Sequence, residues 1–153
     1  MITQKDIKAS YIKILRKSCP EIKKIYETAV EEGYMTPSFF VQMIPLEFRK
    51  RRTASVVSSK YMIETTYLEY KKNEVDQIDI ADKIRTGVGD YLEIGDRKIP
   101  IMDPEIEYTG QTRNIMQFVF YIEFYEDVRE IEKENIVQKI QVKEEIKNGN
   151  AID

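Results

Sequence analysis

The segment Arg113–Tyr125 restricts the fold of this chain more than any other part of the sequence. Its apolar side chains occupy every second position, at Met116, Phe118, Phe120, Ile122 and Phe124. Successive side chains of a β-strand point to opposite faces, so this spacing predicts a strand with one wholly apolar face. The other face mixes apolar and polar residues, which is typical of partial cover. We therefore expect a central strand of a sheet, with one fully buried face and one partly covered face.

Two other segments carry the three-to-four-residue spacing of an amphipathic helix. Thr3-Gln4-Lys5-Asp6 has the spacing of a capping box, and a helix is expected from there to just before Cys19-Pro20, with its apolar face at Ile7, Tyr11, Ile14 and Leu15. Asn73 can cap a second helix, whose inward positions are expected at Ile78, Ala81, Ile84, Arg85, Val88 and Tyr91 or Leu92. Gly87 and Gly89 are expected to weaken its last turn by about 1 kcal/mol each.

The remaining apolar runs predict further strands. These are Ile22–Thr28, Phe39–Ile44 closed by Pro45, Lys60–Tyr70, a hairpin of Leu92–Ile94 with Lys98–Met102, and Glu105–Tyr108. Glu31–Pro37 is expected to form a loop, and 46–60 an extended loop or hairpin. The order of these elements predicts an α+β fold, with a mainly antiparallel sheet and two helices packed on one face.

The composition changes after Asp127. Residues 126–153 hold eight acids and five bases, so residues 1–125 are formally neutral within a total net charge of −3. We interpret 1–127 as one α/β domain and 128–153 as a charged C-terminal arm, which can be a helix, an exchanged strand or a disordered segment. Such a neutral body has no global field that would hold nucleic acid or an anionic membrane.

Catalytic chemistry has few residues to use in this chain. Histidine is absent, and Cys19 is the single cysteine, so neither a cysteine–histidine nucleophile nor a disulfide within the chain is expected. Gly87-Val88-Gly89 closes a helix and is no phosphate-binding loop. Asp76, Asp79 and Asp82 could bind a cation, but we interpret them as a solvated helix face stabilised by the helix dipole. Glu105 and Glu107 share one side of a strand, as paired catalytic carboxylates do, but nothing in the sequence places a substrate cleft beside them. We expect no enzyme, cofactor or metal.

The N-terminus has no basic segment followed by an apolar block, and no stretch approaches the roughly 20 apolar residues of a membrane helix, so no signal peptide or membrane contact is expected. One compact basic run, Arg49-Lys50-Arg51-Arg52, stands out in the neutral body. It can be a solvated flexible loop, a contact for an acidic protein surface or a phosphate contact. Six tyrosines can form a stacking platform or simply pack in the sheet, namely Tyr61, Tyr67, Tyr70, Tyr108, Tyr121 and Tyr125.

The chain resembles the phage tail terminator proteins of tailed phages, prophages and phage-tail-like particles of Gram-positive bacteria. The resemblance covers about residues 4 to 125 and rests on packing patterns. Its segments are the N-terminal helix, Ile25-Tyr26-Glu27, Pro37-Ser38-Phe39-Phe40-Val41, Met62-Ile63-Glu64-Thr65-Thr66-Tyr67, the helix 78–92, the hairpin around Gly95-Asp96, and Phe118-Val119-Phe120-Tyr121.

This resemblance implies a structural subunit of a virion or phage-tail-like particle, assembled in the cytoplasm of a bacterial host. The subunits of this family close into a six-membered ring on the last layer of the tail tube, stop its polymerisation and offer a surface to the neck. The expected partners are further copies of the chain, the tail tube protein, and sheath and neck or connector proteins. The hypothetical contact residues are Arg49, Lys50, Arg51 and Arg52 with Glu130, Glu132 and Glu134. The alternatives are a head–tail connector or neck protein, and a module that binds nucleic acid without sequence specificity.

Overall fold

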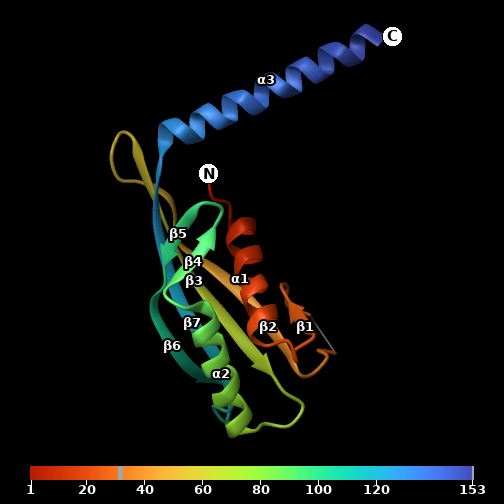
Figure 1. Ribbon diagram of the computed structural model, residues 1–153, viewed down its shortest axis with the longest axis vertical. Helices are drawn as coiled ribbons and strands as arrows, with labels where there is room; N and C mark the ends of the chain where they lie inside the picture. The colour runs from red at the N-terminus through yellow and green to blue at the C-terminus, as the bar shows by residue number, and fades with distance from the viewer. Residues whose placement is uncertain (31–32, 153) are drawn as a thin grey trace.

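A computed structural model describes residues 1–30 and 33–152, and the side chains of 130, 131 and 145–152 lie outside this description. Among the described residues, five strands form the main sheet in the order β1-β2-β3-β7-β6 (Figure 1). These strands are β1 (Lys24–Tyr26), β2 (Ser38–Arg51), β3 (Val56–Leu68), β6 (Met102–Thr109) and β7 (Ile115–Asp127). Every pairing is antiparallel except that of β1 with β2.

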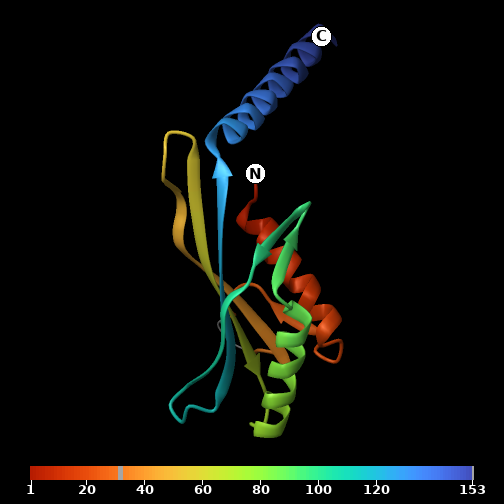
Figure 2. The same ribbon diagram turned by 60° about the vertical axis from the view of Figure 1, so that its left-hand side comes forward.

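Two helices lie on one face of this sheet, together with a small hairpin of β4 (Tyr91–Ile94) and β5 (Arg97–Pro100) (Figure 2). Helix α1 (Gln4–Ser18) begins with the predicted capping box between Thr3 and Asp6. Helix α2 (Glu74–Val88) is capped by Asn73, whose side chain accepts from two backbone N–H groups. The predicted α+β fold, with two helices on one face of a mainly antiparallel sheet, is confirmed.

The core lies between this sheet and the helices. The five alternating apolar residues of β7 are at most 3% exposed, as predicted. Facing them are the buried side chains of α1, which are Ile7, Tyr11, Ile12 and Leu15. The ring of Tyr11 packs edge-on against Phe120, with 5.1 Å between the ring centroids. This single contact already shows how α1 is fixed over the middle of β7.

Three expectations about individual elements were wrong or incomplete. The strand predicted to close at Pro45 continues to Arg51. Proline is tolerated there because β1 pairs only with the first three residues of β2, so that Pro45 lies on an edge. On α2, Ile78 is 49% exposed, and Gln77 is buried instead, where it donates to Glu69 and to the backbone of Asn114. Of the expected loop at 31–37, residues 31 and 32 lie outside the described residues.

The C-terminal segment forms α3 (Val128–Ile152), a single helix that leaves the end of β7 and extends away from the sheet (Figure 1). It is held to the N-terminus by an ion pair between the Met1 amino group and Glu134, 3.1 Å apart. No helix within the described part of the chain is both long enough and apolar enough to cross a membrane. The division into a domain of 1–127 and an arm of 128–153 stays a prediction.

Candidate interaction surfaces

The basic run lies on a hairpin formed by the ends of β2 and β3, which we call the basic hairpin (residues 46–58). This hairpin runs beyond the helix-covered core to the point where α3 begins (Figure 1). Val128 donates its backbone N–H to the carbonyl of Ser55 at 2.7 Å, which ties the tip of the hairpin to the start of α3. Sequence reasoning left this region as a loop or hairpin, and the structure shows ordered ladder pairing out to Arg51, opposite Val57.

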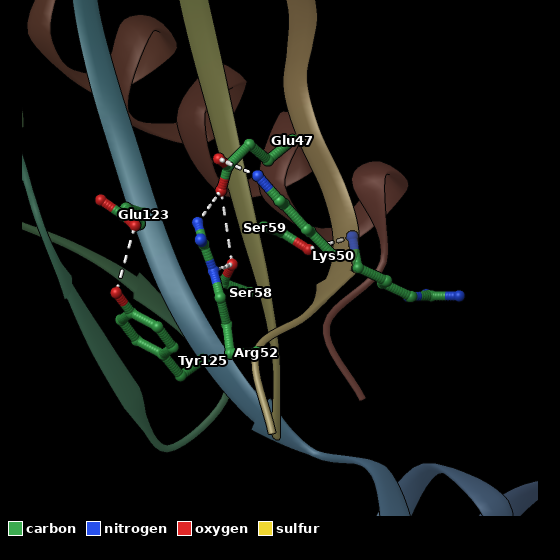
Figure 3. A network of polar contacts seen from close by, with 8 residues as sticks. Glu47, Lys50, Arg52, Ser58, Ser59, Glu123 and Tyr125 are labelled. Carbon is green, nitrogen blue, oxygen red and sulfur yellow. Dashed lines mark hydrogen bonds and ion pairs between the residues drawn. The ribbon is translucent and has the colours of Figure 1, made fainter. Parts of the chain in front are cut away.

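Glu47 organises the charges of the basic hairpin (Figure 3). Its carboxylate accepts from the Arg52 guanidinium and, at 3.3 Å, from the Ser58 hydroxyl, while Lys50 Nζ lies 3.7 Å away. Partial burial opposes ionisation of Glu47, but the hydrogen bond and charge of Arg52 outweigh it and lower the pKa of that carboxyl. Two of the four cations of the basic run are thus committed to an internal partner.

The other two cations, Arg49 and Arg51, are arranged differently. Among the described residues neither has a carboxylate within 4.0 Å. The Arg49 guanidinium lies over the Phe48 ring, 5.0 Å from its centroid, and Arg51 donates to the carbonyl of Ala54 at 3.0 Å. Two large apolar side chains accompany them, since Leu46 is 48% and Phe48 53% exposed. The basic hairpin therefore offers uncommitted positive charge together with exposed apolar surface.

The structure does not bring the predicted acidic residues of the arm to the basic run. Glu134 accepts from the Met1 amino group at 3.1 and 3.3 Å. Glu132 is exposed, and the side chain of Glu130 lies outside the described residues. Within the described part of the chain no ion pair joins the basic hairpin to α3. Neither Glu132 nor Glu134 therefore forms an ion pair with the basic hairpin of the same subunit.

Sequence reasoning missed a third surface, the face of the sheet opposite the helices, which we call the open face. A row of apolar residues crosses it in direct register over four strands: Ile44, Met62, Tyr121 and Met102. On the side toward the beginning of β2, the next two rows contain three carboxylates and no base, at Glu64, Glu105 and Glu107. The alternation within single strands indicated that this face is partly apolar, but only strand order and register align the residues into a row.

The carboxylates Glu64, Glu105 and Glu107 form what we call the acidic end of the open face. Burial raises the pKa of the Glu64 carboxyl, and the nearby charge of Glu107 raises it further. Like charges that oppose each other's ionisation attract a cation. In contrast, the other end of the face holds Lys60, whose ammonium group lies 5.9 Å from the Tyr121 ring centroid. The open face is therefore acidic at one end, whereas the end that continues into the basic hairpin carries Lys60 in register between Glu47 and Glu123.

The described parts of the acidic residues and Cys19 considered from the sequence do not come together in one catalytic or metal site. Asp79 pairs with Lys83 at 3.0 Å, and Lys83 also pairs with Glu21, so this helix face is a partly exposed, ion-paired surface. The described part of the chain contains no group of three or more acids or cysteines that could hold a metal ion. Burial, followed by the charge of Glu21, raises the pKa of the Cys19 thiol to about 11, so the thiolate is scarce at neutral pH.

The six tyrosines are dispersed and form no stacking platform. Tyr61 and Tyr67 are buried under the helices, with 1% and 6% of their surface exposed. Tyr70 lies in the loop before α2 and is 94% exposed, while Tyr125 is half exposed near the basic hairpin and donates to Glu123 (Figure 3). These positions agree with sheet packing, the alternative favoured by residue type.

Comparison with known proteins gives one informative match. A family model described as phage tail terminator protein matches residues 6–135. One similar solved structure is 11% identical in sequence, with 83% of this chain and 96% of that chain covered and a TM-score of 0.46. The search of curated proteins found no match.

Proposed function

Since this chain belongs to the phage tail terminator family, we propose that it forms a ring that caps the last layer of a tail tube. Membership in the family makes it a structural, virion-associated protein that works together with other tail proteins. The finer part of the proposal is that the ring has six copies, halts polymerisation of the tube protein and presents a surface to the neck. Assembly takes place in the cytoplasm of the bacterial host.

The basic hairpin carries this proposal. It holds Arg49 and Arg51 without a carboxylate partner within 4.0 Å in the described part of the chain, beside exposed Leu46 and Phe48. Exposed apolar surface next to uncommitted charge is typical of a surface that meets another protein. We therefore propose that the function of the protein lies on its subunit surfaces.

The contact residues proposed are the basic run and the acids of the arm, namely Arg49, Lys50, Arg51, Arg52, Glu130, Glu132 and Glu134. The four cations of the basic run differ in their ion pairs, and we propose different roles for them. Lys50 and Arg52 shape the hairpin through Glu47, which leaves Arg49 and Arg51 to meet a partner. Helix α3 extends away from the sheet (Figure 1), and we propose that its acids meet the tube, sheath or neck.

A ring imposes a geometric requirement on these surfaces. Head-to-tail contacts are heterologous, so each copy must offer two different complementary patches that close after a fixed number of copies. A stable contact of this kind buries on the order of 800 Å² on each partner. The basic hairpin supplies one such patch.

Electron microscopy of particles from a strain that lacks this protein tests the proposal. Overlong or ragged tubes are expected, because nothing stops polymerisation. Tails of normal length without heads would instead identify a head–tail connector or neck protein. A particle with normal, head-bearing tails contradicts both assignments. Salt-dependent binding of the purified chain to DNA or RNA would favour the nucleic-acid alternative, since phosphate contacts weaken as salt rises.

A further inference from the structure

The open face lies on the side of the main sheet opposite the helices. The opposite face is covered by α1, α2 and the β4–β5 hairpin, whereas the described residues place no helix or strand over the open face (Figure 2). Its row of Ile44, Met62, Tyr121 and Met102 remains partly exposed. A contiguous apolar row on a monomer surface marks a place where a partner binds.

Charge complementarity identifies the occupant. The acidic end of the open face carries Glu64, Glu105 and Glu107 without a base in the same strand rows. The basic hairpin carries the reverse combination, with Arg49 and Arg51 beside exposed apolar side chains. The acidic end of the open face thus places carboxylates next to the apolar row, while the exposed part of the basic hairpin places guanidinium groups next to Leu46 and Phe48. This complementarity favours correct register in a complex.

The hairpin cannot occupy the open face of its own molecule. It is formed by the same strands, β2 and β3, that supply Ile44 and Met62 to the face. A strand that continues straight out of the sheet does not fold back over its own surface (Figure 2). The occupant must therefore come from another copy.

The sheet edges are less suited to join two copies. On β2, Pro45 and register shifts on either side of Glu47 interrupt the outer edge, and Arg49 has a φ of 47°. On β6, Pro104 lies within a register shift between Met102 and Glu105. Proline and bulges are the devices that prevent edge-to-edge pairing of sheets. The open face is therefore better suited than either sheet edge to join two copies of the chain.

We propose that the open face of one copy binds the basic hairpin of a second copy. In this contact Arg49 and Arg51 approach the carboxylates at the acidic end, while Leu46 and Phe48 pack on the apolar row. Each copy uses its hairpin on one neighbour and its open face on the other, which is the heterologous contact a ring needs. The inference rests on the proposed function for its biological setting, and it leaves α3 available to the tube or neck.

The experiment measures self-association of the purified full-length chain by light scattering over a range of concentrations. One variant reverses the hairpin, Arg49→Glu with Arg51→Glu, and a second reverses the face, Glu105→Arg with Glu107→Arg. Each variant alone is expected to weaken association at least tenfold, because like charges then meet across the contact. An equal mixture of the two variants is expected to associate again, since each hairpin then finds a face of opposite charge.

Matched controls separate this contact from a general effect of charge. Lys71→Glu and Glu27→Arg change exposed residues away from both surfaces and are expected to leave association unchanged. Phe48→Ser removes apolar area without changing charge and is expected to weaken association on its own. Circular dichroism melting confirms that each variant is folded. A wild-type chain that stays monomeric even at millimolar concentration, association unaffected by either reversal, or a mixture that fails to associate overturns the proposal.

The outcome is distinguishable from that of the proposed function. Overlong tails in the deletion strain, combined with association that ignores both reversals, would reject this contact and retain the terminator. Tails of normal length, combined with restored association in the mixture, would reject the terminator and retain the contact.

Discussion

A single buried hydrogen bond connects α1 to the sheet, and its removal gives the sharpest test of the fold. The hydroxyl groups of Tyr11 and Thr65 are hydrogen-bonded to each other, and these residues are 0% and 1% exposed. Neither hydroxyl has another partner among the described residues. Tyr11→Phe or Thr65→Val therefore leaves one buried hydroxyl without a partner, whereas the double variant removes both.

The expected magnitudes follow from this arrangement. An unsatisfied buried hydroxyl costs about 1–3 kcal/mol, while removal of both partners of a hydrogen bond can be nearly neutral. Each single variant is thus expected to lower the free energy of unfolding by about 1–2 kcal/mol. The double variant is expected to lose less than the sum of the two, with a coupling energy of about 1 kcal/mol or more. In a chain of this length, 1 kcal/mol corresponds to about 2–4 °C in Tm.

Urea unfolding of the wild type, the two single variants and the double variant measures this cycle. Tyr70→Phe is the control, because Tyr70 is 94% exposed and its hydroxyl is expected to contribute within about 0.5 kcal/mol of zero. Strictly additive losses would refute the reasoning, since they would mean that the two hydroxyl groups do not depend on each other. A double variant less stable than the sum would refute it as well.

Four further outcomes are expected. Gly87→Ala lowers the free energy of unfolding by about 1 kcal/mol or more, because a Cβ there would lie 2.8 Å from Ser18 Cβ; a stabilised variant in urea contradicts this. Glu64→Gln is expected to stabilise the protein at neutral pH but not in acid. The pKa of Glu64 is raised in the folded state, so ionisation of its carboxyl at neutral pH lowers the free energy of unfolding, and glutamine removes this loss. Equal effects of the substitution at both pH values contradict this. Cys19 reacts with iodoacetamide much faster in urea than in the folded protein, and equal rates would show that the thiol is accessible. Removal of residues 130–153 leaves cooperative melting intact, and global loss of circular dichroism would show that the core extends into α3.

Several elements could be predicted from local patterns. The apolar residues at every second position from Met116 to Phe124 predict a strand with one buried face, whichever elements cover that face. In β7 these residues are buried as predicted. The capping box at Thr3 and the cap at Asn73 are interactions within a few residues, so they need no tertiary information. The absence of histidine is a property of the composition. Even the α+β class follows from the order of such elements.

The surfaces proposed for assembly depended on distant residues and could not be predicted in the same way. Pro45 indicated the end of a strand. In the structure β1 pairs only with the first three residues of β2, so Pro45 lies on a sheet edge and β2 continues into the basic hairpin. The basic run was correctly singled out as a candidate. Its division into two cations held by Glu47 and two without such a partner depends on side chains brought together across the hairpin.

The sequence by itself determined which face of β7 is buried, and it determined that Thr3 and Asn73 cap the first turns of α1 and α2. It also determined which catalytic chemistry has no residues to support it. These properties depend on composition and short-range spacing. Only the tertiary structure decided that Gly87 is a point of close contact with Ser18 rather than a weak helix end. It likewise decided that Ile44, Met62, Tyr121 and Met102 form one row. The physical reason is that strand order, register and helix packing join residues far apart in the chain, whereas a local pattern specifies only the face on which each residue lies.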